Sequence, residues 1–363
     1  MNIPFTDLQS QYQEAKVDID AAIQDCIDRN SFITGPDVVH FEKTIADYVG
    51  AEDCASTGSG TMALQVALKA IELQPGDEVI TVSHTFVSTV EAIVNVGATP
   101  VMVDVDEHYL IDIDKIESSI TNRTRAILFV DLLGQTPDID RLRSIADQHG
   151  LYLIADAAQS FGAKHKQRRV GGLVDLTCIS FNPVKNLGAM GDAGCITGRK
   201  DLIARARMYR DHGRNTKFVF ETVGYNARID NIQAAVVLAK LPYLDSWLEQ
   251  RRTICYRYNQ ELSDTVTTPI TPNNNEHSFH VYCIEVDDRD GLQAYLNDAG
   301  IKTNIHYPVP CHLQPAFKYL HNKALPKTEN AVKRILSLPC YHSLTNDQQS
   351  YIIKKIKQWK STQ

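Results

Sequence analysis

The sequence has no apolar run long enough to cross a membrane, and its opening residues, MNIPFTDLQSQYQEAK, contain no basic stretch followed by an apolar one. A membrane-spanning helix needs roughly 20 consecutive apolar residues, and a secretory signal needs the second pattern. Because both are missing, we expect a cytoplasmic protein with no membrane partner.

An excess of positive charge is also absent, because 37 Lys and Arg stand against 44 Asp and Glu, a net charge of −7. Proteins that bind nucleic acid through its phosphates need a basic surface, so nucleic acid is not an expected partner. The 363 residues, 43% of them hydrophobic, contain no internal repeat and exceed what one ordinary core uses. They predict a large domain with a smaller one attached.

Cysteine pairs of the CxxC type are missing as well. Several cysteines lie within apolar runs such as LTCISF and VYCIEV, which is typical of reduced thiols in a core. The pattern favours neither disulfides nor zinc, and we predict no metal site. The eight cysteines are Cys26, Cys54, Cys178, Cys195, Cys255, Cys283, Cys311 and Cys340.

Short apolar runs alternate with amphipathic stretches up to about residue 240. Several runs are apolar on both faces, which predicts a mostly parallel sheet covered by helices, an α/β domain. The last two predicted helices are each expected to end at a glycine. The predicted strands are 77–83, 99–105, 125–131, 151–156, 177–181 and 194–197, and the predicted helices are 61–73, 87–97, 138–150 and 201–213.

The C-terminal third has a different pattern. Residues 246–264 predict a long connecting helix, and the following TPITPNNNEH breaks all regularity. Residues 277–286, 291–300 and 348–359 then predict a small α+β domain. We therefore divide the chain into a large domain, 1–244, and a small one, 245–363.

The stretch STGSGTMALQVALKAI contains Gly58, Gly60 and Ala63 at the spacing of a dinucleotide-binding loop. Such a loop normally follows a strongly apolar strand, and the preceding GAEDCAST is weak for a buried strand. A nicotinamide dehydrogenase is therefore disfavoured. A helix that begins at Gly60 and Thr61 still offers free amides and a dipole to an anion, unless it is only a capped turn.

Asp156 and Lys185 lie in two further motifs. Asp156 ends the apolar run LYLIAD, where ligands of α/β sheets collect, although a carboxylate there could also cap the next helix. Lys185 lies in the glycine-rich SFNPVKNLGAMGDAG, where a lysine could also be a solvated charge or a phosphate clamp. Together with the helix start, these residues match the needs of pyridoxal phosphate (PLP): an amine for its aldehyde, an acid for its ring nitrogen, and amides for its phosphate.

These segments resemble the DegT/DnrJ/EryC1/StrS aminotransferases, which act on nucleotide-linked sugars. The resemblance implies a PLP-dependent transferase of fold type I, like aspartate aminotransferase, with a large, mixed and mostly parallel sheet and a smaller C-terminal α+β domain. It also implies a homodimer with shared active sites. It covers nearly the whole chain and rests on FITGPDVVHFEKTIADYVGA, GSGTMAL, HTFVST, FVDLLGQTPDID, DAAQSFGA, SFNPVKNLGAMGDAG, GYNARIDNIQAA and IHYPVPCHLQPAF.

By this resemblance, Lys185 forms the imine with the cofactor and Asp156 pairs with its pyridinium nitrogen. Gln159 donates a hydrogen bond to the ring hydroxyl. Phe86, which the sequence alone would place in the core, covers the ring. The residues implied for the phosphate are Gly60, Thr61, Met62, Ser180 and, from the other subunit, Asn226; those implied for the sugar-nucleotide pocket are His306 and Tyr307, although His306 could also be an ordinary loop histidine.

Three positions depart from the family pattern. Asp131 replaces a histidine, Asn182 replaces an aromatic residue or histidine, and Ala227 replaces a serine or tyrosine. None of them is Lys185 or Asp156, so we expect the departures to affect which substrate fits more than the chemistry.

The resemblance implies two half-reactions, with the pyridoxamine form (PMP) of the cofactor between them. The expected donor is L-glutamate. The expected acceptor is C3 of a dTDP-3-keto-6-deoxyhexose, because KNLGAMGDAG is closer to C3 aminotransferases than to members with GEGG. The alternatives are transfer to C4 of a dTDP- or UDP-4-keto sugar and, in another class, a non-catalytic PLP-binding regulator. A PMP-dependent sugar dehydratase would have histidine in place of Lys185.

Overall fold

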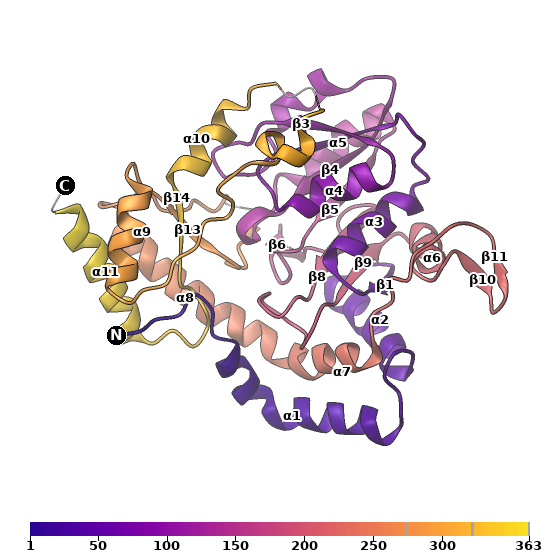
Figure 1. Cartoon of the computed structure of the whole chain (residues 1–363), viewed down its shortest axis with the longest axis horizontal. Coiled ribbons are helices and arrows are strands. Elements are labelled where there is room, and N and C mark those ends of the chain that lie inside the picture. The colour runs from indigo at the N-terminus through magenta and orange to yellow at the C-terminus, as the bar shows by residue number, and fades with distance from the viewer. Residues whose placement is uncertain (273, 321–322, 362–363) are drawn as a thin grey trace.

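The computed structural model describes residues 1–272, 274–320 and 323–361 of the chain. A large body built on one sheet holds most of these residues, and a smaller group of helices with two strands lies beside it (Figure 1). No helix of the described residues combines the length and the apolar character that a bilayer span requires.

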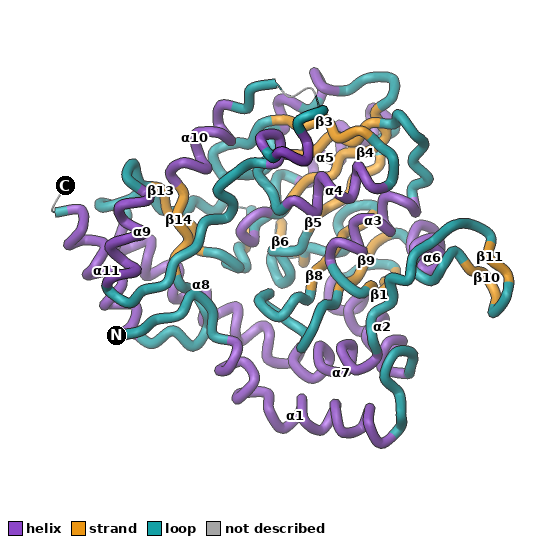
Figure 2. Tube along the Cα trace, viewed as in Figure 1, coloured by secondary structure: helices purple, strands orange, loops and turns teal. Residues whose placement is uncertain are grey.

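The large body is centred on a seven-stranded sheet, drawn in orange among purple helices in Figure 2. β9 runs antiparallel to both of its neighbours, and the other strands of this sheet are mutually parallel. All of the predicted strands and the mostly parallel sheet are confirmed. The order across the sheet is β1 (Asp53–Thr57), β9 (Gly194–Gly198), β8 (Leu176–Ser180), β5 (Tyr152–Asp156), β4 (Thr124–Val130), β2 (Glu78–Val82) and β3 (Thr99–Val103).

β1 is a strand that the sequence did not predict. Ser56 and Thr57 are buried although they are polar. Ser56 donates hydrogen bonds from its amide and its hydroxyl to Glu42, at 2.9 and 2.7 Å, which satisfies its buried polar groups. β1 lies at the sheet edge and pairs antiparallel with β9, whereas a dinucleotide-binding loop follows a central parallel strand. Topology, and not the lack of a strand, therefore argues against the dehydrogenase.

Helices cover both faces of the sheet because side chains along a strand alternate between the faces. In β4, Leu128 packs in a core with Leu64 and Ile93, whereas the adjacent Phe129 packs on the other face in a core with Leu142. The predicted helices are confirmed as α3 (Gly60–Ala70), α4 (Val87–Asn95), α5 (Ile139–His149) and α6 (Lys200–Tyr209).

The ends of two of these helices were predicted to be glycines. α5 is closed by Gly150 in the left-handed conformation, as predicted. α6 ends at Tyr209, and its capping residue Arg210 is right-handed, so the prediction that Gly213 closes α6 is wrong. Gly213 has positive φ and donates its amide hydrogen to Met208 O in the turn that follows.

The helices α1 (Leu8–Asp28), α2 (Pro36–Val49) and α7 (Asn231–Lys240) pack together at one side of the sheet, with α1 along α7 (Figure 1). α8 (Leu244–Leu262) follows and confirms the predicted long helix. The small body contains the antiparallel pair β13 (Tyr282–Glu285) and β14 (Ile335–Leu338), with α9 (Arg289–Asp298), α10 (Pro326–Arg334) and α11 (Asn346–Lys360).

The small body has its own core, which includes Tyr258, Tyr282 and Ile352. Ile3 is buried in the same core and pairs with Ile301, so the first residues of the chain pack with its C-terminal part. The domain boundary between residues 244 and 245 stays a prediction.

Two small sheets lie outside the large one. β6 (Lys164–His165), β7 (Arg168–Arg169) and β12 (Asn275–Glu276) form the first, and β10 (Arg214–Thr216) pairs with β11 (Val219–Phe220) in a hairpin that projects beyond α6 (Figure 1). All eight cysteines are buried free thiols, which confirms the prediction of reduced core cysteines. The 3₁₀ turns are Ile113–Lys115, Glu117–Ser119, Leu132–Gly134, Leu241–Tyr243, Cys311–Leu313 and Pro315–Phe317.

Candidate active site

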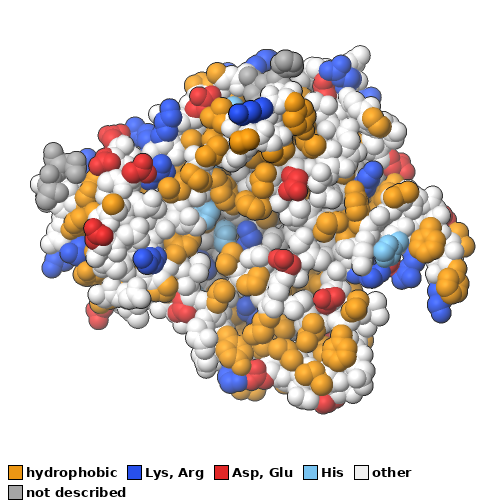
Figure 3. Space-filling view, viewed as in Figure 1, with side chains coloured by type: hydrophobic (Ala, Val, Ile, Leu, Met, Phe, Trp, Pro, Cys, Tyr) orange, Lys and Arg blue, Asp and Glu red, His pale blue; other side chains and the backbone are white. Residues whose placement is uncertain are grey.

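A cavity of about 390 Å³ opens at the carboxyl ends of β5 and β8, beside the first turns of α3 and α4. The face of the molecule in Figure 3 is hollowed at its centre, where basic and histidine side chains are visible. The carboxyl ends of parallel strands are where α/β proteins bind ligands. Most of the predicted site residues line the cavity: Gly60, Thr61, Phe86, Asp156, Gln159, Ser180, Lys185 and Tyr307.

Asp156 ends β5 and is 6% exposed. The hydroxyl of Thr89 donates to its Oδ2 at 2.7 Å, and the amide of Ala158 donates to its Oδ1 at 3.2 Å. Burial raises the pKa of Asp156, and these two hydrogen bonds and the charge of Lys185 act against the rise. The carboxylate therefore lies in a cavity wall with oriented oxygens and a cation nearby.

Lys185 enters the cavity from the loop after β8. Its amide donates to Asn182 O at 2.9 Å, which forms a tight turn. Burial lowers the pKa of Lys185 to about 8, against the opposing effect of Asp156. No described residue accepts a hydrogen bond from its Nζ, so the amine remains available to a ligand. An amine with a pKa this close to neutrality can act both as a nucleophile and as a base.

The start of α3 faces the same cavity. Ser59 caps the helix by accepting a hydrogen bond from the Met62 amide at 3.1 Å, and the amides of Gly60 and Thr61 find no acceptor among the described residues. A Cβ at Gly60 would lie 2.7 Å from the Cβ of Ser180, so glycine is required for the close approach of β8. The free amides and the Ser180 hydroxyl thus form an anion site.

Aromatic side chains form another wall of the cavity. Gln159 accepts a hydrogen bond from the Leu133 amide at 2.6 Å and donates to the Tyr307 hydroxyl at 3.0 Å. Phe86 is 53% exposed and its ring centre lies 5.6 Å from that of Tyr307, so the placement of Phe86 in the core from sequence alone is wrong. Such a wall suits a flat aromatic ligand.

His306 lies behind the cavity wall. Its Nδ1 pairs with the Ser337 hydroxyl at 2.9 Å, and its carbonyl oxygen lies 3.0 Å from Nε2 of His84. Burial and, to a smaller extent, the charge of Lys185 lower the pKa of His306 to about 4. The ring is therefore neutral and held in place, next to the tyrosine that does line the cavity.

Met62 and Asn226 also lie outside the cavity lining. The amide of Met62 is occupied by the Ser59 cap. Asn226 is exposed and lies in an isolated bridge with Asp211. Within one chain, Asn226 therefore does not meet the other phosphate-site residues.

The three departures from the family pattern occupy different surroundings. Asp131 is fully buried and accepts a hydrogen bond from Ser160 at 2.7 Å. Burial raises the pKa of Asp131 to about 7, which keeps much of it neutral at neutral pH. Asn182 lines the cavity and donates to Asp192 at 2.9 Å. Ala227 is buried, so a larger polar residue would need room there.

Thr89 and Asp192 are site residues that sequence reasoning missed. Thr89 links Asp156 to the hydroxyl of Thr85, which lies 2.7 Å from its own. It falls three residues after Phe86, on the same side of the first turn of α4, and that spacing was an available signal. Asp192 lines the cavity through the glycine-rich loop.

A free amine, a buried carboxylate and an anion-binding helix start around a flat cavity define a PLP-dependent enzyme of the α/β class. The residues fit the cofactor. The unbonded amides of Gly60 and Thr61 suit its phosphate, Asp156 suits its ring nitrogen, and the unbonded amine of Lys185 suits its aldehyde.

The family model of the DegT/DnrJ/EryC1/StrS aminotransferases matches residues 13–357. The chain belongs to this family and is a PLP-dependent sugar-nucleotide aminotransferase.

Three relatives are similar over nearly their whole length. A "pleiotropic regulatory protein" of Geobacillus stearothermophilus is 41% identical over 99% of this chain and 99% of its own. A dTDP-3-amino-3,4,6-trideoxy-alpha-D-glucose transaminase of Streptomyces venezuelae is 38% identical over 98% of this chain and 96% of its own. A UDP-2-acetamido-2-deoxy-3-oxo-D-glucuronate aminotransferase of Pseudomonas aeruginosa is 40% identical over 93% and 95%.

Solved structures agree with the fold and the cofactor. DesV of S. venezuelae, in complex with a ketimine intermediate, has a TM-score of 0.96 at 38% identity. The match covers 99% of this chain and 98% of the DesV chain. NtdA of Bacillus subtilis, with the cofactor PMP bound, has a TM-score of 0.93 at 31% identity over 99% and 85%. The predicted fold type I architecture and the predicted PLP cofactor are thus confirmed.

Proposed function

We propose that the enzyme transfers the amino group of L-glutamate to C3 of a dTDP-3-keto-6-deoxyhexose. The main support for this chemistry is that Lys185 and Asp156 line the same cavity at the strand ends. The position of transfer is supported by the glycine-rich loop GAMGDAG, which contributes Asp192 to the cavity, and by two relatives named for a 3-amino and a 3-oxo sugar.

The roles of the polar residues follow from their surroundings. When bound, PLP supplies an aldehyde for imine formation and a ring that accepts electrons. Asp156, oriented by Thr89 and Ala158, stabilises a proton on the ring nitrogen. Lys185 Nζ, with a pKa of about 8, takes a proton from the donor α-carbon and later returns one to the acceptor carbon.

The remaining residues hold the ligands. The Gly60 and Thr61 amides, the helix turn at Met62 and the Ser180 hydroxyl bind the cofactor phosphate, and Phe86 covers the ring. Gln159, which now donates to Tyr307, donates instead to the ring hydroxyl. His306 and Tyr307 form part of the wall of the sugar-nucleotide pocket. The neutral, fixed ring of His306 sets the position of Tyr307.

A homodimer completes this site. Asn226 lies outside the cavity of its own chain, so its proposed contact with the phosphate requires a second copy. Exposed apolar side chains support an interface: Phe32, Ile33, Val39, Phe218, Val219, Phe220 and Val223. Orange side chains on the projecting hairpin and on the lower part of the face in Figure 3 agree with this. A monomer needs no such surface.

We also propose a domain division and a cellular compartment. The chain divides into domains 1–244 and 245–363, because α8 begins at Leu244 and leads to a separate core. The compartment is the cytoplasm, where the eight buried thiols stay reduced.

The alternative is amination at C4 of a dTDP- or UDP-4-keto sugar. Purified holoenzyme should be incubated with L-glutamate and a panel of dTDP- and UDP-linked 3-keto and 4-keto sugars, and the nitrogen in the product located by NMR. Nitrogen at C3 of the dTDP sugar supports the proposal. Nitrogen at C4 overturns the proposed regiochemistry, and product from the UDP-linked sugars alone overturns the proposed nucleotide.

A further inference from the structure

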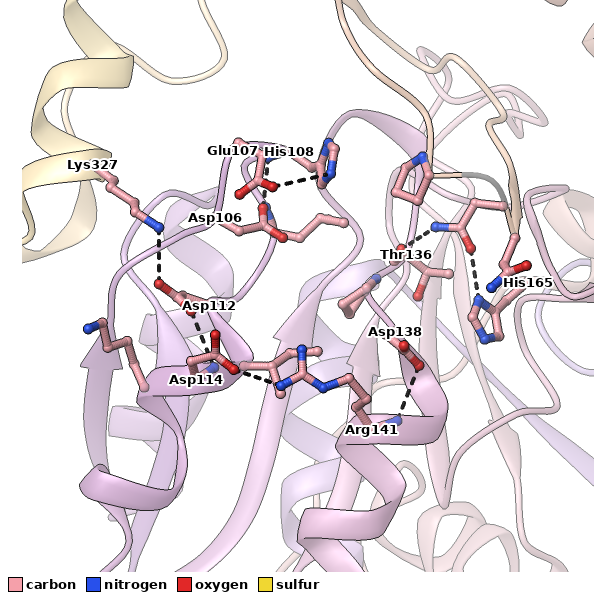
Figure 4. Close-up of a pocket in the computed structure, with 17 residues that line it drawn as sticks. Asp106, Glu107, His108, Asp112, Asp114, Thr136, Asp138, Arg141, His165 and Lys327 are labelled. Atoms are coloured by element: carbon pink, nitrogen blue, oxygen red, sulfur yellow. Dashed lines mark hydrogen bonds and ion pairs between the residues drawn. The ribbon is translucent and has the colours of Figure 1, made fainter.

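A second cavity of about 390 Å³ lies at the start of α5 and is rich in carboxylates (Figure 4). Asp138 and His165 line this cavity, Asp140 lies beside them, and one ligand atom from each of the three lies within 4.8 Å of the other two. We propose that these residues bind a divalent transition-metal cation of the Zn²⁺ class. This site is separate from the cofactor cavity and goes beyond the aminotransferase activity.

His165 is the strongest sign of a ligand. The residue is 2% exposed, and its Nε2 has no hydrogen-bond partner among the described residues. Its Nδ1 lies 2.8 Å from Asn275 Oδ1, and Asn275 Nδ2 donates to Thr136 O at 2.5 Å (Figure 4). Because the amide nitrogen is already used as a donor, the amide oxygen faces His165 and Nδ1 carries the hydrogen. Nε2 therefore presents a lone pair toward the carboxylates.

This arrangement is the one that metal-binding histidines use, in which the second ring nitrogen donates to an oxygen that fixes the tautomer. Strand pairing maintains it, because Asn275 of β12 lies opposite His165 of β6. A lone pair that faces carboxylates is unfavourable, and among the described residues the ammonium of Lys166, paired with Asp140, is the cation that offsets this cost. A bound dication removes that cost.

Asp138 and Asp140 supply the carboxylates. Asp138 caps α5, and its Oδ1 accepts hydrogen bonds from the amides of Asp140 and Arg141 at 3.2 Å each, while no described residue occupies Oδ2. Asp140 Oδ2 lies 3.9 Å from His165 Nε2. Bond lengths of roughly 2.0–2.2 Å require the ligand atoms to approach a little further. Both aspartates are exposed, so their side chains can rotate to do so.

Competing cations set the strength of the site. Lys166 pairs with Asp140 but is half-exposed on the outer side, so its ammonium can leave. Arg141 is engaged by Asp114 and Lys327 by Asp112, so these two charges are already matched. A mixed nitrogen and carboxylate set favours Zn²⁺, Co²⁺ or Ni²⁺ over Mg²⁺ or Ca²⁺.

Zn²⁺ and Co²⁺ should be titrated into chelator-treated holoenzyme, with stoichiometry and affinity measured by calorimetry and the Co²⁺ absorption spectrum recorded. We expect one ion per chain without thiolate charge-transfer bands. Asp140→Asn and His165→Gln should each raise Kd by about 10- to 100-fold. Asp140→Asn keeps the proposal testable because residue 140 is exposed and the variant should fold. His149→Gln, beside Glu117, is the matched control and should leave Kd unchanged.

Lys166→Gln provides the sharpest test, because removal of the competing ammonium should tighten Zn²⁺ binding. A purely structural ion-pair cluster would give no binding in any variant. Absence of binding to the wild type, or a Kd that neither Asp140→Asn nor His165→Gln changes, would overturn the proposal. Mg²⁺ in place of Zn²⁺ should bind weakly or not at all. Aminotransferase activity should be the same in Asp140→Asn and the wild type.

Discussion

Two lysines have different roles at the same glycine-rich loop. Lys185 extends from the loop into the cofactor cavity, and Lys240, at the end of α7, donates to Gly188 O at 2.6 Å and to Gln11 Oε1 at 3.2 Å. Burial lowers the pKa of each to about 8. A lowered pKa therefore does not by itself identify a reactive amine.

What distinguishes the two lysines is whether the amine is already occupied. Lys240 is 6% exposed and its ammonium is bound on two sides, so it can only hold the loop. Lys185 has no hydrogen-bond acceptor among the described residues and faces Asp156 across a cavity. Reactivity thus depends on an open space and a free amine.

The largest effect should come from Lys185→Ala, which should lower kcat by at least about 1,000-fold, because general acid–base catalysis and imine formation are both lost. Borohydride reduction of the wild-type holoenzyme followed by peptide mapping should place the cofactor on Lys185 and not on Lys240. Retained transamination in the variant, or a label on Lys240, would contradict the assignment. PMP should still bind to the variant.

Asp156→Asn should fold and bind the cofactor but lose about 100- to 1,000-fold in kcat, because a carboxamide cannot stabilise the protonated ring nitrogen. Single-turnover kinetics with L-glutamate would measure the loss. Thr89→Val is the matched control, since it removes the hydrogen bond that orients Asp156 but keeps the charge, and it should cost less. A near-normal rate in Asp156→Asn would argue against the role of this carboxylate.

Asn226→Ala should weaken cofactor binding by about 10-fold, the effect of losing one hydrogen bond to a charged group. Hybrids of Asn226→Ala chains with Lys185→Ala chains would show whether the two residues serve one site across chains. Because each mutation would then damage the same site, one site of the hybrid should remain intact and active. The comparison needs a cofactor concentration that leaves the Asn226→Ala parent largely unloaded; hybrids without more activity than either parent under that condition would refute the shared site.

Much of the large body could be predicted because its signals are local. Strands buried on both faces, such as β4, contain apolar runs like AILFV, and the site residues Asp156 and Ser180 end two further strands of this kind. The carboxyl ends of parallel strands meet, so the cavity could be predicted from the order of these motifs.

The features that were missed depend on partners far away in the sequence. β1 is half polar and is buried because Glu42 satisfies Ser56. Phe86 has the sequence environment of a core residue, yet it faces the cavity because α4 begins beside it. His165 and Asp138 belong to segments that only the fold brings together, so no spacing rule for metal ligands could find them.

The smallest effect should come from Lys240→Met, which removes the support of Gly188 and should lower kcat only a few-fold.

A sharper signature of Lys240→Met is the pH dependence of stability. In the folded protein the pKa of Lys240 is lowered from 10.5 to about 8, so between these pH values the unfolded chain binds more protons, and stability rises with pH. In the holoenzyme Lys185 is blocked by the cofactor and adds nothing to this rise. Thermal unfolding of the holoenzyme at pH 7.5 and 9.5 should therefore show a smaller relative gain at high pH in Lys240→Met than in the wild type. An equal gain in the variant and in the wild type would show that Lys240 is not a buried, titrating amine.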